Sequence, residues 1–284
     1  GNLDAVRWAM RQPHGMVLCC GPTGSGKTTT LYAAMTEANT PDVNIVTAED
    51  PIEYPLAGIT QLQVDKKIGL TFARALRSFL RMDPDVILVG EIRDKKTASC
   101  AIEAALTGHL LLSTLHTNDA ASTVTRFVEM KVEPFLISSS LLLVSAQRLA
   151  RRLCIHCRVP FEPSPQVRAV LEADPHPLGK TIFQAREKGC ERCGGTGYKG
   201  RVGIHEILAL RDEMGAAMRE LVHRKVGSEV MKARAVELGM RTMWQDALWK
   251  VKEGITDLRE AGSIVKADAV KAKTKAARSA ARST

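Results

Sequence analysis

The chain has 284 residues, 45% of them apolar and 4% aromatic, which is an ordinary globular composition with room for an α/β core and a smaller module. The longest nearly apolar run, residues 135–146, is broken by serines and is too short to cross a bilayer. The sequence shows no secretory signal, and we expect a cytoplasmic protein and neither an exported nor a membrane-spanning one. The chain begins at Gly1, close to its first strand, so we expect a piece of a longer protein.

The formal net charge of +9 is concentrated at one end of the chain. The segment from Ser263 to Thr284 supplies +5 of it and has little apolar surface to bury. This composition predicts a disordered, solvated basic tail, residues 263–284, with contact to a polyanion or an acidic membrane as the alternative. We therefore expect no specific nucleic acid as a partner.

A short helix is predicted over residues 2–12 and a buried strand over residues 16–20. The next eight residues match the phosphate-loop pattern G-x-x-x-x-G-K-[ST], and a helix is predicted directly after them. Glycines let the backbone turn tightly and aim N–H groups at an anion, and the helix N-terminus adds its dipole. We expect Lys27 to reach the β- and γ-phosphates and Thr28 to hold Mg²⁺. The predicted nucleotide-binding residues are Gly21, Pro22, Thr23, Gly24, Ser25, Gly26, Lys27, Thr28 and Thr29.

A second predicted strand, residues 43–47, is followed by three carboxylates, Glu49, Asp50 and Glu53. In an open parallel sheet, ligands bind at the carboxyl ends of the strands. Carboxylates beside a polyphosphate would repel it unless they held metal or activated water, which favours a catalytic role over a solvated turn.

The helix predicted over residues 71–81 is amphipathic, with Arg74, Arg77 and Arg81 on its polar face. This arginine stripe is a solvated face or a surface turned toward a neighbouring subunit, and both interpretations stay open. A buried strand, residues 86–89, then leads to Glu91. An acidic residue at the end of a hydrophobic strand is what a phosphate-loop enzyme needs to hold magnesium opposite Thr28.

A helix over residues 96–106 and a strand over residues 110–114 follow, with His109 and His116 on either side of that strand. We expect Asn118 and Asp119 to cap a helix over residues 121–130. A long, largely buried helix is predicted from Phe135 to Arg152.

Two C-x-x-C pairs, 32 residues apart, come next. Four thiolates on two tight knuckles close a tetrahedral structural zinc site, and the absence of an export signal argues against disulfides. His156 lies inside the first knuckle and is predicted to be a bystander. The other three cysteines, Cys19, Cys20 and Cys100, are predicted to be buried. The predicted zinc ligands are Cys154, Cys157, Cys190 and Cys193.

After the second knuckle, residues 194–206 are turn-rich and then extended, and helices are predicted from Asp212 onward, with methionines at helical spacing in their core. The predicted organisation is a P-loop ATPase core in residues 1–150, a tetracysteine module in 151–208, a helical subdomain in 209–262 and the basic tail.

In order and spacing, these motifs closely resemble the secretion-superfamily ATPases. The phosphate loop, the acidic stretch from Glu49 to Glu53, the Glu91 strand end and the His109-to-Asp119 segment correspond to the Walker A, Asp, Walker B and His boxes of that family. The cysteine quartet resembles the branch that assembles type IV pili or drives type II secretion, and not the pilus-retraction branch. The resemblance extends over about residues 1–262.

This resemblance implies a RecA-like α/β fold and an ATP-hydrolysing motor that works as a cytoplasmic homo-hexamer, peripheral to the inner membrane, on an integral-membrane platform protein. It implies that Glu53 activates the attacking water, that Glu91 organises Mg²⁺, and that His109 and His116 contact the γ-phosphate. The family's preceding domain, which supplies arginine fingers, is absent from this sequence, so the isolated chain is expected to turn ATP over poorly.

Two other classes of function stay open on the residues alone. A nucleic-acid-translocating ATPase would share the phosphate loop, although the cysteine quartet and the acidic box argue against it. A scaffold that binds nucleotide and zinc with weak hydrolysis is the second alternative.

Overall fold

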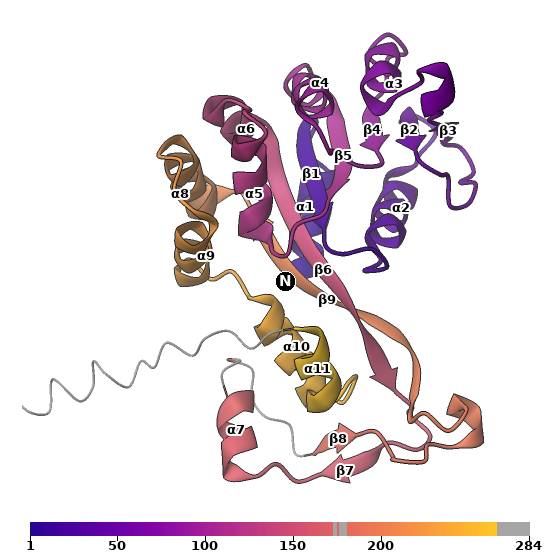
Figure 1. Cartoon of the computed structure of the whole chain (residues 1–284), viewed down its shortest axis with the longest axis vertical. Coiled ribbons are helices and arrows are strands. Elements are labelled where there is room, and N and C mark those ends of the chain that lie inside the picture. The colour runs from indigo at the N-terminus through magenta and orange to yellow at the C-terminus, as the bar shows by residue number, and fades with distance from the viewer. Residues whose placement is uncertain (173–174, 176–180, 266–284) are drawn as a thin grey trace, which may run out of the picture. The chain divides into compact units, whose positions relative to one another are not determined.

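A computed structural model describes residues 1–172, 175 and 181–265 (Figure 1). The basic tail predicted from residue 263 lies outside the described residues from residue 266 onward. None of the helices in the described part of the chain is both long and apolar enough to cross a bilayer. The chain divides into two compact units, the first comprising Gly1–Leu149 and Gly203–Met243, the second comprising Ala150–Val202 and the chain from Trp244.

The first unit is built on a largely parallel sheet, and the α/β fold class predicted from the sequence is confirmed. The strand order is β3-β2-β4-β5-β1-β6-β9, and β1 pairs in parallel with β5 on one side and with β6 on the other. The strands are β1 (Gly15–Cys20), β2 (Ile45–Glu49), β3 (Thr60–Gln63), β4 (Val86–Val89), β5 (Leu110–Leu115), β6 (Leu141–Leu153) and β9 (Tyr198–Ala209).

The helices of the first unit cover the sheet. The strands β1, β2, β4 and β5 are buried along their whole length, as expected for parallel strands with helices on both faces. The helices are α1 (Asn2–Met10), α2 (Lys27–Ala38), α3 (Phe72–Phe79), α4 (Lys95–Leu106), α5 (Ala120–Glu129), α6 (Pro134–Ser140), α8 (Asp212–His223) and α9 (Ser228–Glu237), with a short 3₁₀ turn, η1, at Lys66–Ile68.

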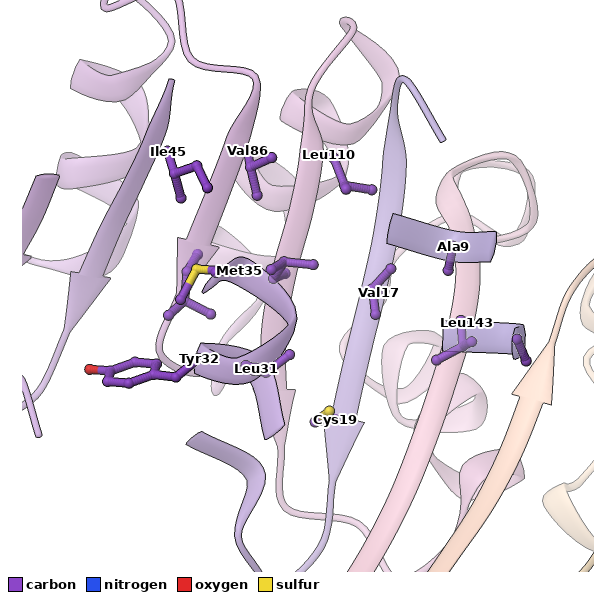
Figure 2. Packing of buried hydrophobic residues seen from close by; sticks show 13 residues of the cluster. Ala9, Val17, Cys19, Leu31, Tyr32, Met35, Ile45, Val86, Leu110 and Leu143 are labelled. Atoms are coloured by element: carbon purple, nitrogen blue, oxygen red, sulfur yellow. The ribbon is translucent and has the colours of Figure 1, made fainter. Parts of the chain in front are cut away.

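Alternate residues along each strand face opposite sides of the sheet, and α1 and α2 pack on one side. Figure 2 shows Leu31 and Met35 of α2 and Ala9 of α1 with Val17 and Leu110 of the sheet, in one buried cluster. This packing fixes α2, and therefore the phosphate loop that precedes it, against the centre of the sheet.

The long helix predicted from Phe135 to Arg152 is wrong. Helix α6 ends at Ser140, and β6 then runs beside β1, with Leu141 paired to Met16 and Ala146 to Cys20. An apolar run of this length is compatible with a buried helix and with a buried strand. Here the run forms a strand because it pairs with the edge of β1. Helix α6 ends in serines, and Ser140 Oγ donates to the Leu136 carbonyl, a bond that weakens a helix.

The second unit contains a two-stranded antiparallel sheet, β7 (Val159–Phe161) with β8 (Ile182–Gln184), and a 3₁₀ turn, η2, at Glu191–Cys193. Helices α7 (Pro165–Leu171) and α11 (Leu258–Ile264) belong to it, as does α10 (Met243–Lys252) from Trp244 onward. The carboxylate of Glu260 on α11 is 6% exposed and pairs with the Arg151 guanidinium at 2.6 Å.

A buried carboxylate joins three elements of the first unit. The Glu206 side chain on β9 is fully buried and accepts hydrogen bonds from the Ala120 N–H at 3.0 Å and the Met243 N–H at 3.3 Å. Its charge is balanced by the Lys232 ammonium on α9, 3.0 Å away. Glu206 therefore ties the N-terminus of α5 to β9 and α9.

We expect Glu206→Ala to lower the free energy of unfolding by about 3 to 5 kcal/mol, because it removes the buried carboxylate that accepts from two backbone N–H groups and pairs with Lys232. Urea unfolding measures this change. The matched control is Glu220→Ala on α8, which removes an exposed pair with Arg224 and should cost no more than about 1 kcal/mol. Equal effects of the two substitutions would contradict this role for Glu206.

Candidate active site and metal centre

Four neighbouring parallel strands, β2, β4, β5 and β1, end at the same edge of the sheet. The acidic stretch with Glu53 follows β2, Glu91 follows β4, His116 follows β5 and the phosphate loop follows β1. Residues far apart in the sequence are thus gathered at the carboxyl edge, where parallel sheets bind ligands.

The phosphate loop has the backbone that its glycines predict. Gly21, Gly24 and Gly26 all have positive φ angles, and Gly26 is the N-cap of α2. A Cβ on Gly21 or Gly26 would collide with Gln147 of β6, so only glycine fits between the loop and this strand. Thr30 Oγ1, one turn into α2, donates to Gln147 Oε1 at 2.8 Å.

Two side chains of the loop are suited to bind an anion. Lys27 Nζ donates to the carbonyls of Gly21 at 2.9 Å and Pro22 at 3.0 Å, which holds the ammonium over the loop. Burial lowers the pKa of Lys27, and the negative charge of Glu91 opposes that fall. Ser25 Oγ is buried and has no hydrogen-bond partner among the described residues. An unpaired hydroxyl beside a buried cation fits the oxygens of a phosphate.

Glu91 lies close to two other polar side chains of this edge. Its carboxylate, 13% exposed, is 2.6 Å from Arg93 Nε and 3.4 Å from His116 Nε2. A carboxylate is the kind of hard oxygen donor that Mg²⁺ prefers. The structure thus brings Glu91, His116 and Lys27 together.

The three carboxylates at the end of β2 and directly after it have different environments. Glu49 is buried and accepts hydrogen bonds from Tyr32, Thr47 and Gln61. Asp50 forms an exposed ion pair with Lys66 at 3.0 Å. Glu53 is exposed, in the loop between β2 and β3. Only Glu53 therefore has a carboxylate that is free of an ion pair among the described residues and is also accessible to a substrate.

His109 lies at the opposite edge of the sheet. It precedes β5, and its carbonyl accepts from the N–H of Gly15 at the start of β1. The six residues of β5 separate His109 from His116, and a strand of that length spans about 20 Å. Its Nδ1 lies 3.0 Å from the Ala104 carbonyl. Within one chain, the geometry does not bring His109 to the phosphate loop as the resemblance implied, because a strand separates the two histidines.

Other residues singled out from the sequence have simpler roles. The side chain of Asp119 accepts from the Ser122 N–H and caps α5. Cys19 and Cys20 are buried, and burial raises the pKa of Cys19 to about 12 and that of Cys20 to about 11, so both stay protonated. On α3, Arg74 and Arg77 are exposed, and neither forms an ion pair with the described residues.

In the second unit, the sulfurs of Cys154, Cys157, Cys190 and Cys193 lie within 4.8 Å of one another. The Cys154–Cys190 and Cys157–Cys193 sulfurs are each 3.9 Å apart. Zn–S bonds of about 2.3 Å in a tetrahedron place sulfurs about 3.8 Å apart, whereas a disulfide needs about 2.05 Å. All four thiols are free of disulfides, so the cluster fits a closed tetrahedral metal centre.

The backbone around Cys193 favours a thiolate at that residue. The N–H groups of Cys190 and Gly197 donate to Cys193 Sγ at 3.1 and 3.3 Å and lower the pKa of that thiol to about 6. The ring of His156 is outside the cluster, with its Nδ1 3.1 Å from Arg192 Nη1. Four sulfurs without a histidine leave no open position, as in structural zinc sites.

Sequence reasoning did not assign Tyr32, Gln61, Gln147 and Glu206, whose side chains support these sites. Glu206 leaves a local signal, because it alternates with the buried residues Ile204 and Leu208 and so is a carboxylate at an inward position of a strand.

The sequence model of a protein family described as Type II/IV secretion system protein matches residues 1–263. The chain belongs to this family. Its relatives include the Type IV pilus assembly ATPase PilB of Thermus thermophilus, 49% identical over 92% of this chain and 29% of that protein. They also include the Type II secretion system ATPase E of Vibrio cholerae, 47% identical over 93% of this chain and 51% of that protein. This family member therefore spans from about a third to about half the length of these relatives.

Among solved structures, the crystal structure of the pilus retraction motor PilT with bound ADP is similar to this family member. The TM-score is 0.66, with 29% sequence identity over 92% of this chain and 64% of that one. A DotB ATPase of Legionella pneumophila gives a TM-score of 0.65 with 26% identity over 92% of this chain and 62% of that one.

Proposed function

We propose that this chain is the ATPase domain of a motor that powers type IV pilus assembly or type II protein secretion. The observation that carries the proposal is the meeting of the phosphate loop, Glu91 and His116 at one sheet edge, with Glu53 on the loop that leaves the same edge. The two curated relatives described above bear the names of ATPases of these machines.

Each residue has a role that its position supports. The loop N–H groups and Lys27 hold the β- and γ-phosphates of ATP, and Thr28 with Glu91 would hold Mg²⁺. Bound Mg²⁺ would supply charge neutralisation at the phosphate oxygens. Glu53 takes the proton of the attacking water, and His116, beside Glu91, contacts the γ-phosphate. The four-cysteine cluster would hold a structural Zn²⁺.

We further propose that the motor is a cytoplasmic homo-hexamer acting on a platform protein at the inner membrane. The family membership and the relatives' names support a role within such a machine. Membrane association would then be peripheral and would go through partners.

The proposed function is tested on the phosphate loop. Lys27→Ala should weaken ATP binding by about tenfold or more and reduce hydrolysis with it, because the backbone cradle loses the cation that balances the β- and γ-phosphate charge. Titration with a fluorescent ATP analogue and phosphate release measure the two effects.

Lys96→Ala on α4 is the matched control, since it removes an exposed lysine outside the site and should change neither quantity. ATP binding by Lys27→Ala at the wild-type affinity would contradict the assignment. Salt-sensitive stimulation of hydrolysis by DNA would favour a nucleic-acid motor instead.

A further inference from the structure

The loop that carries Glu53, residues 50–59, has no regular secondary structure and is held by side chains from outside it. Gln61 of β3 uses both ends of its amide for this purpose. Its Oε1 accepts from the Leu56 N–H at 2.7 Å, and its Nε2 donates to the Tyr54 carbonyl at 3.3 Å. These bonds bracket the part of the loop directly after Glu53.

The same amide belongs to a buried cluster under the loop. Gln61 Nε2 lies 3.1 Å from Glu49 Oε1 and 3.3 Å from the Tyr32 hydroxyl. The Glu49 carboxylate also accepts from Tyr32 and from Thr47 Oγ1. We refer to Tyr32, Thr47, Glu49 and Gln61 as the Glu49 cluster. A buried carboxylate with every neighbour donating to it holds those neighbours in defined positions.

Tyr32 connects this cluster to the phosphate loop. It lies on α2 four residues after Thr28, so the two side chains share one face of the helix. Its ring packs edge-on against Tyr54, with centroids 4.8 Å apart. Figure 2 shows the Tyr32 hydroxyl pointing away from the aliphatic side chains of the hydrophobic cluster between α2 and the sheet. Burial and the bond to Glu49 raise the pKa of Tyr32, and a backbone hydrogen bond from Glu53 opposes the rise.

We propose that Tyr32 and Gln61 are positioning residues for Glu53, which set the distance between that carboxylate and the phosphate loop. The inference rests on the proposed function, in which Glu53 activates water. Neither residue touches the reacting atoms. Both act through the backbone of residues 53–56. Gln61 bonds the Leu56 N–H and the Tyr54 carbonyl directly, and the Tyr32 hydroxyl accepts a backbone hydrogen bond from Glu53. A misplacement of about 1 Å can slow a reaction by about a hundredfold.

The test compares Tyr32→Phe, which keeps the ring and removes the hydroxyl, with Gln61→Met, which keeps the length and removes both amide contacts. In steady-state ATP hydrolysis by the full chain, each should lower kcat by about tenfold or more while KM and ADP affinity change by less than about twofold. In the Glu53→Gln background, Tyr32→Phe should cause no further loss, since both changes remove the same function.

Thr36→Val is the control, because it removes a hydroxyl one turn further along α2 whose hydrogen bond within the described chain goes to the Tyr32 carbonyl. Melting temperatures show whether each variant is folded at the assay temperature, and Gln61→Met decides the matter if Tyr32→Phe does not fold. Wild-type kcat in the folded variants, or a further tenfold loss in the Glu53→Gln background, would overturn the positioning role alone. A wild-type chain that neither binds ATP nor hydrolyses it in single-turnover assays at high protein concentration would overturn the proposed function itself.

Discussion

Glu53→Gln should bind Mg-ATP as well as the wild type and hydrolyse it about a hundredfold more slowly, or worse. Glutamine keeps the shape of the side chain but cannot accept the proton of the attacking water. Glu53 has no ion pair with the described residues and lies in an exposed loop. Its replacement therefore leaves the phosphate loop and the contacts of Glu91 with Arg93 and His116 intact. Nucleotide titration and single-turnover rates, with the protein in excess, separate binding from chemistry.

Glu91→Gln is the informative comparison because it should fail in another way. The negative charge of Glu91 raises the pKa of Lys27, and the carboxylate lies beside His116 and Arg93. Replacing it with a neutral amide therefore changes the charge around the phosphate-binding loop. Hydrolysis should slow, and the magnesium concentration for half-maximal rate should rise. Normal hydrolysis by Glu53→Gln, together with an inactive Glu91→Gln that binds ATP with an unchanged magnesium requirement in nucleotide titrations, would make Glu91 the base.

The second large effect concerns the cysteine cluster. We expect about one zinc per chain by elemental analysis, and we expect Cys154→Ser and Cys190→Ser to lose the metal together with the cooperative unfolding of the second unit. Apparent zinc-binding free energies in small zinc-dependent folds are about 10 to 16 kcal/mol. Among the described residues, the second unit has a two-stranded sheet, the ends of β6 and β9 and short helices to replace that stabilisation.

His156→Ala is the matched control for the cysteine variants. His156 lies between two cluster cysteines in the sequence, but its ring contacts Arg192 and not the sulfurs, so the variant should keep its zinc. Calorimetric melting with and without a chelator measures the same dependence on the wild-type protein. A metal-free protein whose melting is unchanged would exclude a structural zinc site.

Short-range features of this protein were predictable because the local sequence dictates them. A phosphate loop needs glycines at positive φ, and Gly21, Gly24 and Gly26 all have it. The strand before the loop and the helix after it were predicted from their periodicity and are present. The proximity of the two C-x-x-C knuckles followed from their ligand chemistry, and the four sulfurs do lie together.

Only the tertiary structure decided the rest. The apolar run after Phe135 is compatible with a buried helix and with a buried strand. It forms a strand because its residues from Leu141 onward pair with the edge of β1. The two histidines that flank β5 look alike in sequence, but one strand length separates them. The Glu49 cluster joins Tyr32 to Gln61, and Glu206 joins Ala120 to Met243. A hydrogen bond between distant segments does not alter the residue pattern of either segment, so it cannot be predicted from that pattern. The sequence alone therefore determined which chemical groups the site contains, and the packing of the chain decided which side chains hold them in place.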